Sequence, residues 1–246
     1  MIITKYFNAE SNWEHYSSGS FKVGTLSEYR GYEHTQLARM TDRGEGTVSK
    51  QFGSGVGHVP YATVGPVTLT NFNFSAPGGI VVENSFNEHV FCASVGTYKK
   101  EHHELMRFGG VDREGQAYVG NEDLDAFAEI DFDRFLMALR AWCRQSGRMT
   151  TRTIASQYVF SKPVTYGENR NTYYDLEKIA LANAPFGDEE LKRAIFSKPI
   201  EFLAEAEIRV VVSTKFPDLP DRDAAPLFPS SAKLRDSILH LGTLEG

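Results

Sequence analysis

The sequence predicts a mixed α+β fold in which the strands are joined mainly by short, turn-rich connections. Three observations support this. The 246 residues are 41% hydrophobic and 12% aromatic, which is enough for a sizeable core and excludes a disordered chain. Strand-like runs occupy both ends of the chain, and the clearest helical pattern lies between them. Hairpin-style spacing favours antiparallel sheets over a doubly wound parallel sheet, and no linker divides the chain, so we expect one domain spanning residues 1–246.

The first third of the chain is predicted to contain strands, one short helix and a glycine-rich loop. Residues 2–7 are predicted to form a strand, and residues 10–17 a short helix that ends at Gly19. Residues 20–26 alternate and predict a second strand. Residues 41–60 are rich in glycine and predict a loop.

The middle of the chain carries the strongest local patterns. Two β-prone runs between residues 67 and 85 flank a Pro-Gly-Gly turn and predict a hairpin, and residues 89–95 predict a buried strand. Apolar residues recur at helical spacing over residues 131–145, with Asp131 as the expected N-cap and Gly147 as the expected stop. This stripe consists of Phe132, Phe135, Leu136, Leu139, Trp142 and Cys143.

The last third is predicted to return to strands. We expect strands over residues 156–166 and 206–213, separated by a helix over residues 188–196. The proline-rich stretch 216–229 predicts a loop, and residues 231–241 predict a final amphipathic helix.

Charge and cysteine content limit the class of protein. The net charge of −6 argues against charge-driven adhesion to nucleic acid or to an anionic membrane. The sequence contains no run of 18 apolar residues, so no membrane span is predicted. The N-terminus does not have the pattern of a signal peptide. Cys92 and Cys143 form neither a disulfide framework nor a metal-ligand spacing, so we expect a reducing, cytoplasmic location.

The segment 202–212 is the most informative for chemistry. If it is a strand, then Glu205, Glu207 and Arg209 share one face. Two carboxylates beside a guanidinium can bind a sugar hydroxyl and stabilise positive charge that develops on a ribose. The competing interpretation is a solvated strand face with a cross-strand salt bridge.

A second candidate site lies between residues 21 and 33. Gly24 and Thr25 follow a predicted strand, and Tyr29 and Arg30 come next. Tyrosine can stack on a planar ring, and arginine can hold a phosphate in a bidentate manner. The competing interpretation is a glycine-containing turn in which Arg30 pairs with a nearby glutamate.

Two further motifs carry less information. Arg43 lies in an Asp-Arg-Gly-Glu stretch that is either an ordinary polar turn or a loop that folds over a ligand. His102 and His103 are adjacent, and neighbouring residues point away from each other, so we interpret them as surface residues rather than as a metal site. No metal site is predicted.

Three segments, in their order along the chain, resemble the ADP-ribosyltransferase superfamily in its bacterial toxin and defence branches. They are Lys5-Tyr6-Phe7, then Phe21 to Arg30, then Glu205-Ala-Glu207. The resemblance implies split antiparallel β-sheets with helical insertions around a cleft for NAD. It makes Glu207 the catalytic residue that binds the nicotinamide ribose, with Glu205 orienting the acceptor or the ribose. There is no histidine on the first strand and no Ser-Thr-Ser motif, so neither main subgroup is matched in full.

The resemblance also implies a set of cofactor-binding residues. Arg30 would contact the ribose or phosphate, and Arg43 offers a second cation for the pyrophosphate. Ser94 lies in a Phe-Cys-Ala-Ser run that corresponds to the serine-bearing strand of one subgroup. The resemblance also implies that Tyr6, Thr25 and Tyr29 contact the cofactor.

The expected function is therefore that of an NAD-dependent ADP-ribosyltransferase. Its acceptor would be RNA, DNA or a protein, in the setting of a toxin or a phage-defence effector, and a partner antitoxin is left open. An NAD glycohydrolase on the same fold is the first alternative. A non-enzymatic nucleotide- or protein-binding module and a metal-dependent nuclease are the others.

Overall fold

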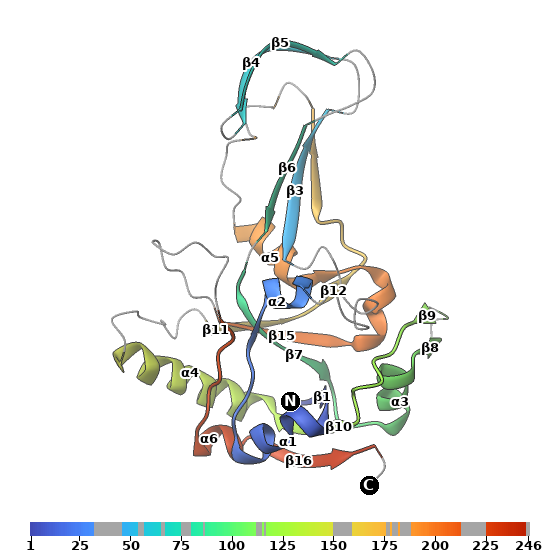
Figure 1. The fold of residues 1–246 in the computed structure, drawn as a ribbon, viewed down its shortest axis with the longest axis vertical. Coiled ribbons are helices and arrows are strands. Elements are labelled where there is room, and N and C mark those ends of the chain that lie inside the picture. Colours follow the sequence, from blue (N-terminus) through green and yellow to red (C-terminus); the bar gives the residue numbers. More distant parts are fainter. Residues whose placement is uncertain are drawn as a thin grey trace.

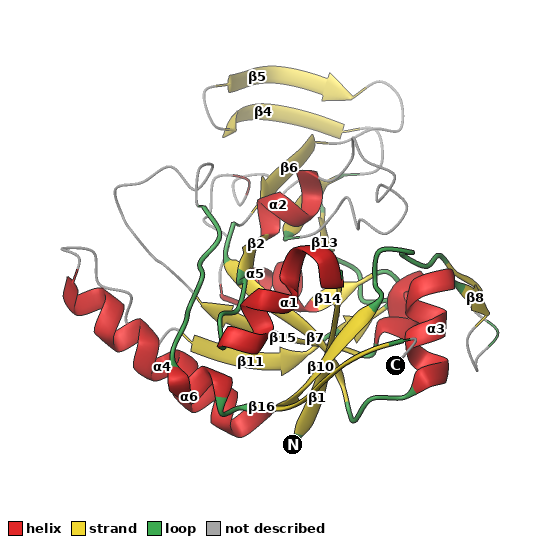
Figure 2. Ribbon diagram, turned by 60° about the horizontal axis from the view of Figure 1, so that its bottom comes forward, coloured by secondary structure: helices red, strands yellow, loops and turns green. Residues whose placement is uncertain are grey.

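A seven-stranded antiparallel sheet forms the base of the molecule in the computed structural model (Figures 1 and 2). The structure describes residues 1–31, 46–53, 57–64, 67–74, 80–85, 87–111, 117–149, 159–175, 188–212 and 225–244, with residues 115, 178 and 182. Six strands run in the order β11-β15-β7-β1-β10-β16, and β2 pairs with β7 beside them. Their bounds are β1 Ile2–Phe7, β2 Gly24–Thr25, β7 His89–Val95, β10 Ala126–Asp131, β11 Val159–Pro163, β15 Glu207–Val212 and β16 Ile238–Thr243.

One face of this sheet is covered by helices. Helix α4 (Phe132–Met149) packs there with α1 (Ala9–Ser18) and α6 (Ala232–Arg235), as Figure 2 shows. The predicted stripe of α4 faces the core, although Trp142 is only partly buried. Asp131 caps the helix as expected, because its carboxylate accepts from the backbone N–H groups of Asp133 and Arg134. The helix continues past the expected stop at Gly147.

A second group of strands stands above the base sheet (Figure 1). Strands β3 (Thr47–Phe52), β6 (Ile80–Ser85) and β13 (Asn171–Tyr174) form one small sheet, and β4 (Gly57–Val64) pairs with β5 (Val67–Phe74). The predicted loop over residues 41–60 is therefore wrong for residues 47–52 and 57–60, which belong to β3 and β4, while residues 41–45 and 54–56 lie outside the described residues. The hairpin predicted between residues 67 and 85 is also wrong, since β5 pairs with β4 and β6 with β3.

Shorter elements complete the described part of the chain. They are α2 Leu26–Gly31, α3 Lys100–Phe108, α5 Asp188–Phe196, β8 Gly110–Val111, β9 Ala117–Tyr118, β12 Thr165–Tyr166, β14 Ser197–Lys198 and a 3₁₀ helix, η5, at Ile200–Glu205. The strand predicted over residues 20–26 is reduced to β2 and two isolated bridges. The final helix predicted over residues 231–241 is mostly wrong, because the chain leaves α6 after one turn and pairs with β10 as β16. Pairing at a free sheet edge overrides the helical spacing there.

The fold is confirmed as α+β with antiparallel sheets, and the predicted strand at β1 and helices at α1 and α5 are also confirmed. No helix among the described residues is long and apolar enough to cross a membrane.

The turn after α1 offers a test of local packing. Gly19 ends this helix with φ 76°, and a Cβ added there would lie 2.5 Å from Arg235 Cβ. We expect Gly19→Ala to lower the free energy of unfolding by about 2–5 kcal/mol, because it combines left-handed backbone with overpacking. Urea denaturation measures this loss.

Gly115 is the matched control. Its φ is 81°, but no described atom lies within 4 Å of an added Cβ. Gly115→Ala should therefore cost only the backbone penalty, about 1–2 kcal/mol. Equal losses at the two positions would show that the packing of α1 against α6 does not matter for stability.

Candidate functional site

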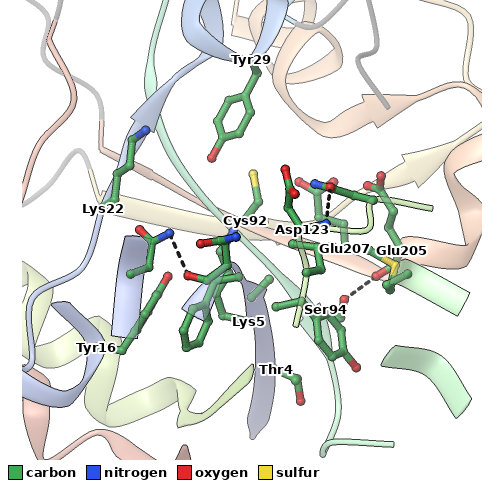
Figure 3. A pocket seen from close by; sticks show the side chains of 18 of the residues that line it. Thr4, Lys5, Tyr16, Lys22, Tyr29, Cys92, Ser94, Asp123, Glu205 and Glu207 are labelled. Carbon is green, nitrogen blue, oxygen red and sulfur yellow. Dashed lines mark hydrogen bonds between the residues drawn. The ribbon is translucent and has the colours of Figure 1, made fainter. Parts of the chain in front are cut away.

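A pocket of about 710 Å³ opens where strands β1 and β7 separate. These strands pair only at Ile3 with Val95 and at Thr4 with Ser94, whereas β1 stays paired with β10 along its whole length. Further along the same edge, Val90 of β7 pairs with Gly24 of β2. The pocket therefore occupies a gap in the sheet, and it is lined by both strands and by residues of α1, α2, β14, η5 and β15 (Figure 3).

Four buried ionisable residues form a cluster at one side of the pocket. Lys198 Nζ lies 2.5 Å from Glu205 Oε2 and 2.7 Å from Glu207 Oε2, and Arg209 Nε lies 2.6 Å from Glu207 Oε1. The Arg209 guanidinium also donates to the backbone carbonyl of Ile195. Exposure is only 1% for Arg209, 5% for Glu207 and 8% for both Glu205 and Lys198. The solvated strand face considered from the sequence is thus ruled out.

The two glutamates reach the cluster from different elements. Glu207 and Arg209 lie on one face of β15, as predicted, but Glu205 is the last residue of η5 and not part of the strand. Ala206 connects them with φ 45° and ψ 45°, and it is the one described non-glycine residue with positive φ. That backbone conformation costs about 1–2 kcal/mol for an alanine. The tight turn brings the Glu205 carboxyl back to the start of β15.

Hydrogen bonds hold this turn from several sides. Ser94 Oγ donates to the Glu205 carbonyl at 2.7 Å, and the backbone N–H of Glu207 donates to Tyr166 Oη at 2.7 Å. Helix α3 contributes through His102, whose Nε2 lies 2.8 Å from the Ala204 carbonyl. A carbonyl can only accept, so Nε2 carries the proton and Nδ1 accepts from Tyr6 Oη at 2.9 Å. The turn is therefore fixed by groups on β1, β7, β12 and α3.

The two carboxyls have opposite proton preferences. Burial raises the pKa of Glu205 to about 7, and the Glu207 carboxylate, which is also its hydrogen-bond partner, adds to this rise while Lys198 opposes it. Burial would also raise the pKa of Glu207, but Arg209 and Lys198 hold it well below its usual range. At neutral pH the site therefore holds one fixed carboxylate, Glu207, and one carboxyl, Glu205, that is present in both its protonated and its ionised form.

The structure brings most of the predicted site residues together. Glu205, Glu207, Ser94, Tyr6 and Tyr29 all line the pocket.

Thr25 is not part of the pocket lining. Its hydroxyl accepts from the backbone N–H of Glu28 and contacts Ser27 Oγ, so it supports the start of α2. Arg30 follows Tyr29 on α2, but its side chain lies outside the described residues, and so does the whole of Arg43.

Three site residues were missed from the sequence. Lys198 and Lys5 line the pocket, and His102 supports η5 from α3. The available signal for Lys198 was its position at the end of the largely apolar run 194–198, where a charged side chain is unusual. The surface interpretation of His102 and His103 is wrong, because His103 is fully buried and its Nε2 lies 2.9 Å from the Leu124 carbonyl. Within the described ranges, no three His, Cys, Asp or Glu side chains gather in a way that could hold a metal ion.

Comparison with known proteins adds no family to this description. The chain matches no family model, no curated protein and no solved structure. Any functional conclusion therefore depends on the geometry and charge of the pocket.

The raised pKa of Glu205 predicts a specific dependence of stability on pH. A carboxyl that titrates near 4.5 when unfolded and about 7 when folded binds more protons in the folded state between these values. Stability from this group is therefore complete below about pH 4.5 and is lost as the pH rises through 7, by about 3 kcal/mol in total. We expect Glu205→Gln to remove this loss, so that urea unfolding at pH 5 to 8 gives a flatter profile than in the wild type.

Glu207→Gln is the contrasting variant. It leaves Arg209 buried without its carboxylate and Lys198 with only one of its two, and breaking such a buried pair costs about 3–5 kcal/mol. The two substitutions should therefore differ strongly at pH 8. Similar losses for both would contradict the assignment of opposite proton preferences.

Proposed function

We propose that this chain is an NAD-dependent ADP-ribosyltransferase that cleaves the bond between nicotinamide and ribose and transfers ADP-ribose to a macromolecular acceptor. The observation that carries the proposal is the pair of buried carboxyls with opposite proton preferences, side by side in one pocket. Breaking a glycosidic bond through a cationic sugar needs one fixed anion and one group that moves a proton. The pocket volume of about 710 Å³ is in the range of small-molecule and cofactor sites.

Glu207 is the proposed stabiliser of the sugar cation. As nicotinamide leaves, positive charge develops on the ribose, and a carboxylate that is already in place lowers this barrier without reorganisation. Arg209 holds Glu207 through the Nε contact of 2.6 Å, and the backbone N–H of Glu207 is fixed on Tyr166. The low pKa of Glu207 keeps its charge at every physiological pH.

Glu205 is the proposed general base. A group with a pKa of about 7 can take a proton from an acceptor hydroxyl or amine near neutral pH and release it afterwards. The carboxyls of Glu205 and Glu207 both contact the ammonium of Lys198. Proton transfer and charge stabilisation would therefore occur in the same part of the pocket (Figure 3). Lys198 would keep the two carboxyls in fixed relative positions.

The arrangement of the sheet supports the same proposal. The pocket lies in a gap between antiparallel strands, which agrees with the split sheets expected for the ADP-ribosyltransferase type. Tyr29 adds an aromatic ring to the pocket wall, and Lys22 adds a basic side chain. The net charge of −6 favours a protein or single-stranded RNA as acceptor over duplex DNA, whose binding depends on many cationic contacts.

The proposal is tested with labelled NAD and, in turn, RNA, DNA and cell lysate as acceptors. We expect nicotinamide release by the wild type and a loss of about 10²-fold in kcat for Glu207→Asp, which keeps the charge for Arg209 but displaces the carboxylate. The rate should rise with pH through about 7, and Glu205→Gln should remove this rise, since the base must be deprotonated to act.

Glu201→Gln is the matched control, because Glu201 is an exposed glutamate on the same 3₁₀ helix as Glu205. It should retain wild-type turnover. Free ADP-ribose as the sole product with every acceptor would instead indicate an NAD glycohydrolase. Absence of both NAD turnover and NAD binding by calorimetry in the folded wild type would overturn the enzyme proposal.

A further inference from the structure

Lys5 reaches the pocket from an unusual direction. Its neighbours at alternate positions of β1, Ile3 and Phe7, belong to the core beneath the sheet. Lys5 Nζ lies 5.6 Å from the ring centroid of Phe91, which belongs to the same core, and Lys5 also lines the pocket, as Phe7 does. The Lys5 amine therefore lies beside a core ring and also at the wall of the pocket between β1 and β7 (Figure 3).

The surroundings of this amine differ from those of the other pocket cations. Lys198 and Arg209 are each paired with a glutamate, whereas no carboxylate among the described residues forms an ion pair with Lys5. The titratable groups of the same pocket that act on the Lys5 amine are the Cys92 thiol, Glu207, Glu205 and the ammonium of Lys198.

Burial is the main influence on Lys5, and it lowers the pKa of this amine despite the two glutamates. Burial raises the pKa of the Cys92 thiol, so the thiol stays neutral and gives Lys5 no counter-charge. Lys5 is only partly buried by solvent exposure, but a partly buried amine without an ion-pair partner is still more often unprotonated than a surface lysine, and the unprotonated amine is the nucleophile.

We propose that Lys5 is a nucleophilic site that forms a Schiff base with aldoses in their open-chain aldehyde form. The Nζ lone pair adds to the carbonyl carbon, and one of the two Nζ protons moves to the carbonyl oxygen to give a neutral carbinolamine. Glu205 protonates this hydroxyl, water leaves, and Nζ returns its remaining proton to Glu205. Amine and aldehyde thus become imine and water, with no oxidation or reduction.

The rest of the pocket suits a sugar. Neutral hydroxyl and amide groups line it, and these can both donate to and accept from sugar hydroxyls. They belong to Thr4, Asn8, Ser11, Asn12 and Asn121. ADP-ribose is an aldose of this class, so capture of ADP-ribose would connect Lys5 to the proposed reaction, but the inference does not rest on that reaction.

Reductive trapping tests the site. The wild type is incubated at pH 7 with ribose, and separately with ADP-ribose, in the presence of cyanoborohydride, which reduces the imine to a stable amine. Peptide mass mapping then measures adduct formation at every lysine. We expect Lys5 to be labelled about tenfold faster than Lys99 and Lys100, which are exposed on the surface.

Lys5→Arg is the matched variant, since it keeps the positive charge but presents a guanidinium that stays protonated. It should lose the fast adduct and retain slow labelling elsewhere. Equal labelling of Lys5, Lys99 and Lys100 in the wild type would overturn the proposal, and this comparison stands even if Lys5→Arg does not fold.

The two proposals fail in different ways. Fast trapping at Lys5 without NAD turnover would support the amine site and overturn the transferase proposal. NAD turnover without fast trapping at Lys5 would support the transferase proposal and overturn the amine site.

Discussion

The buried ion pairs of Lys198, Glu205, Glu207 and Arg209 are the constraint on which the rest of the site depends. Removing such charges from water costs several kcal/mol for each ion, and only close pairing with good hydrogen bonds offsets this. The short contacts to Glu207 and Glu205 provide that pairing, but only because η5 ends where it does and Ala206 adopts a left-handed conformation. The strained turn is tolerated because it allows both carboxyls to meet one ammonium.

Strand β7 transmits this constraint to the rest of the sheet. It pairs with β15 along its full length, so the position of Glu207 is set by its register against Ser94. On its other edge β7 pairs with β1 at one end and with β2 at the other, and the pocket occupies the interval. The same strand therefore positions the carboxyls, supports η5 through Ser94 Oγ and forms a wall of the cavity. A shift in the position of β7 would therefore alter the carboxyls, the support of η5 and the wall of the cavity together.

The parts of the fold that were predictable from the sequence are those whose pattern is local. The apolar stripe of α4 and the buried run of β7 can be predicted because the spacing of their own residues determines which side chains are buried. The edge strand β16 and the pairing of β3 with β6 depend on distant partners, which spacing does not reveal. The site divides in the same way. Alternation correctly placed Glu207 beside Arg209, whereas Lys198 and Lys5 reach the pocket only through the tertiary arrangement.

The register of β1 links the two chemical features of the pocket. Tyr6 points to α3 and fixes η5 through His102, while Lys5 starts from the opposite face of β1 and lines the pocket beside the Phe91 ring. Successive side chains of a strand alternate, so a shift of one residue against β10 would exchange these directions. The Lys5 amine would then leave the pocket between β1 and β7, and the support that Tyr6 gives to η5 through His102 would also be lost. The six pairs between β1 and β10 are therefore as important to the chemistry of the pocket as the residues that line it.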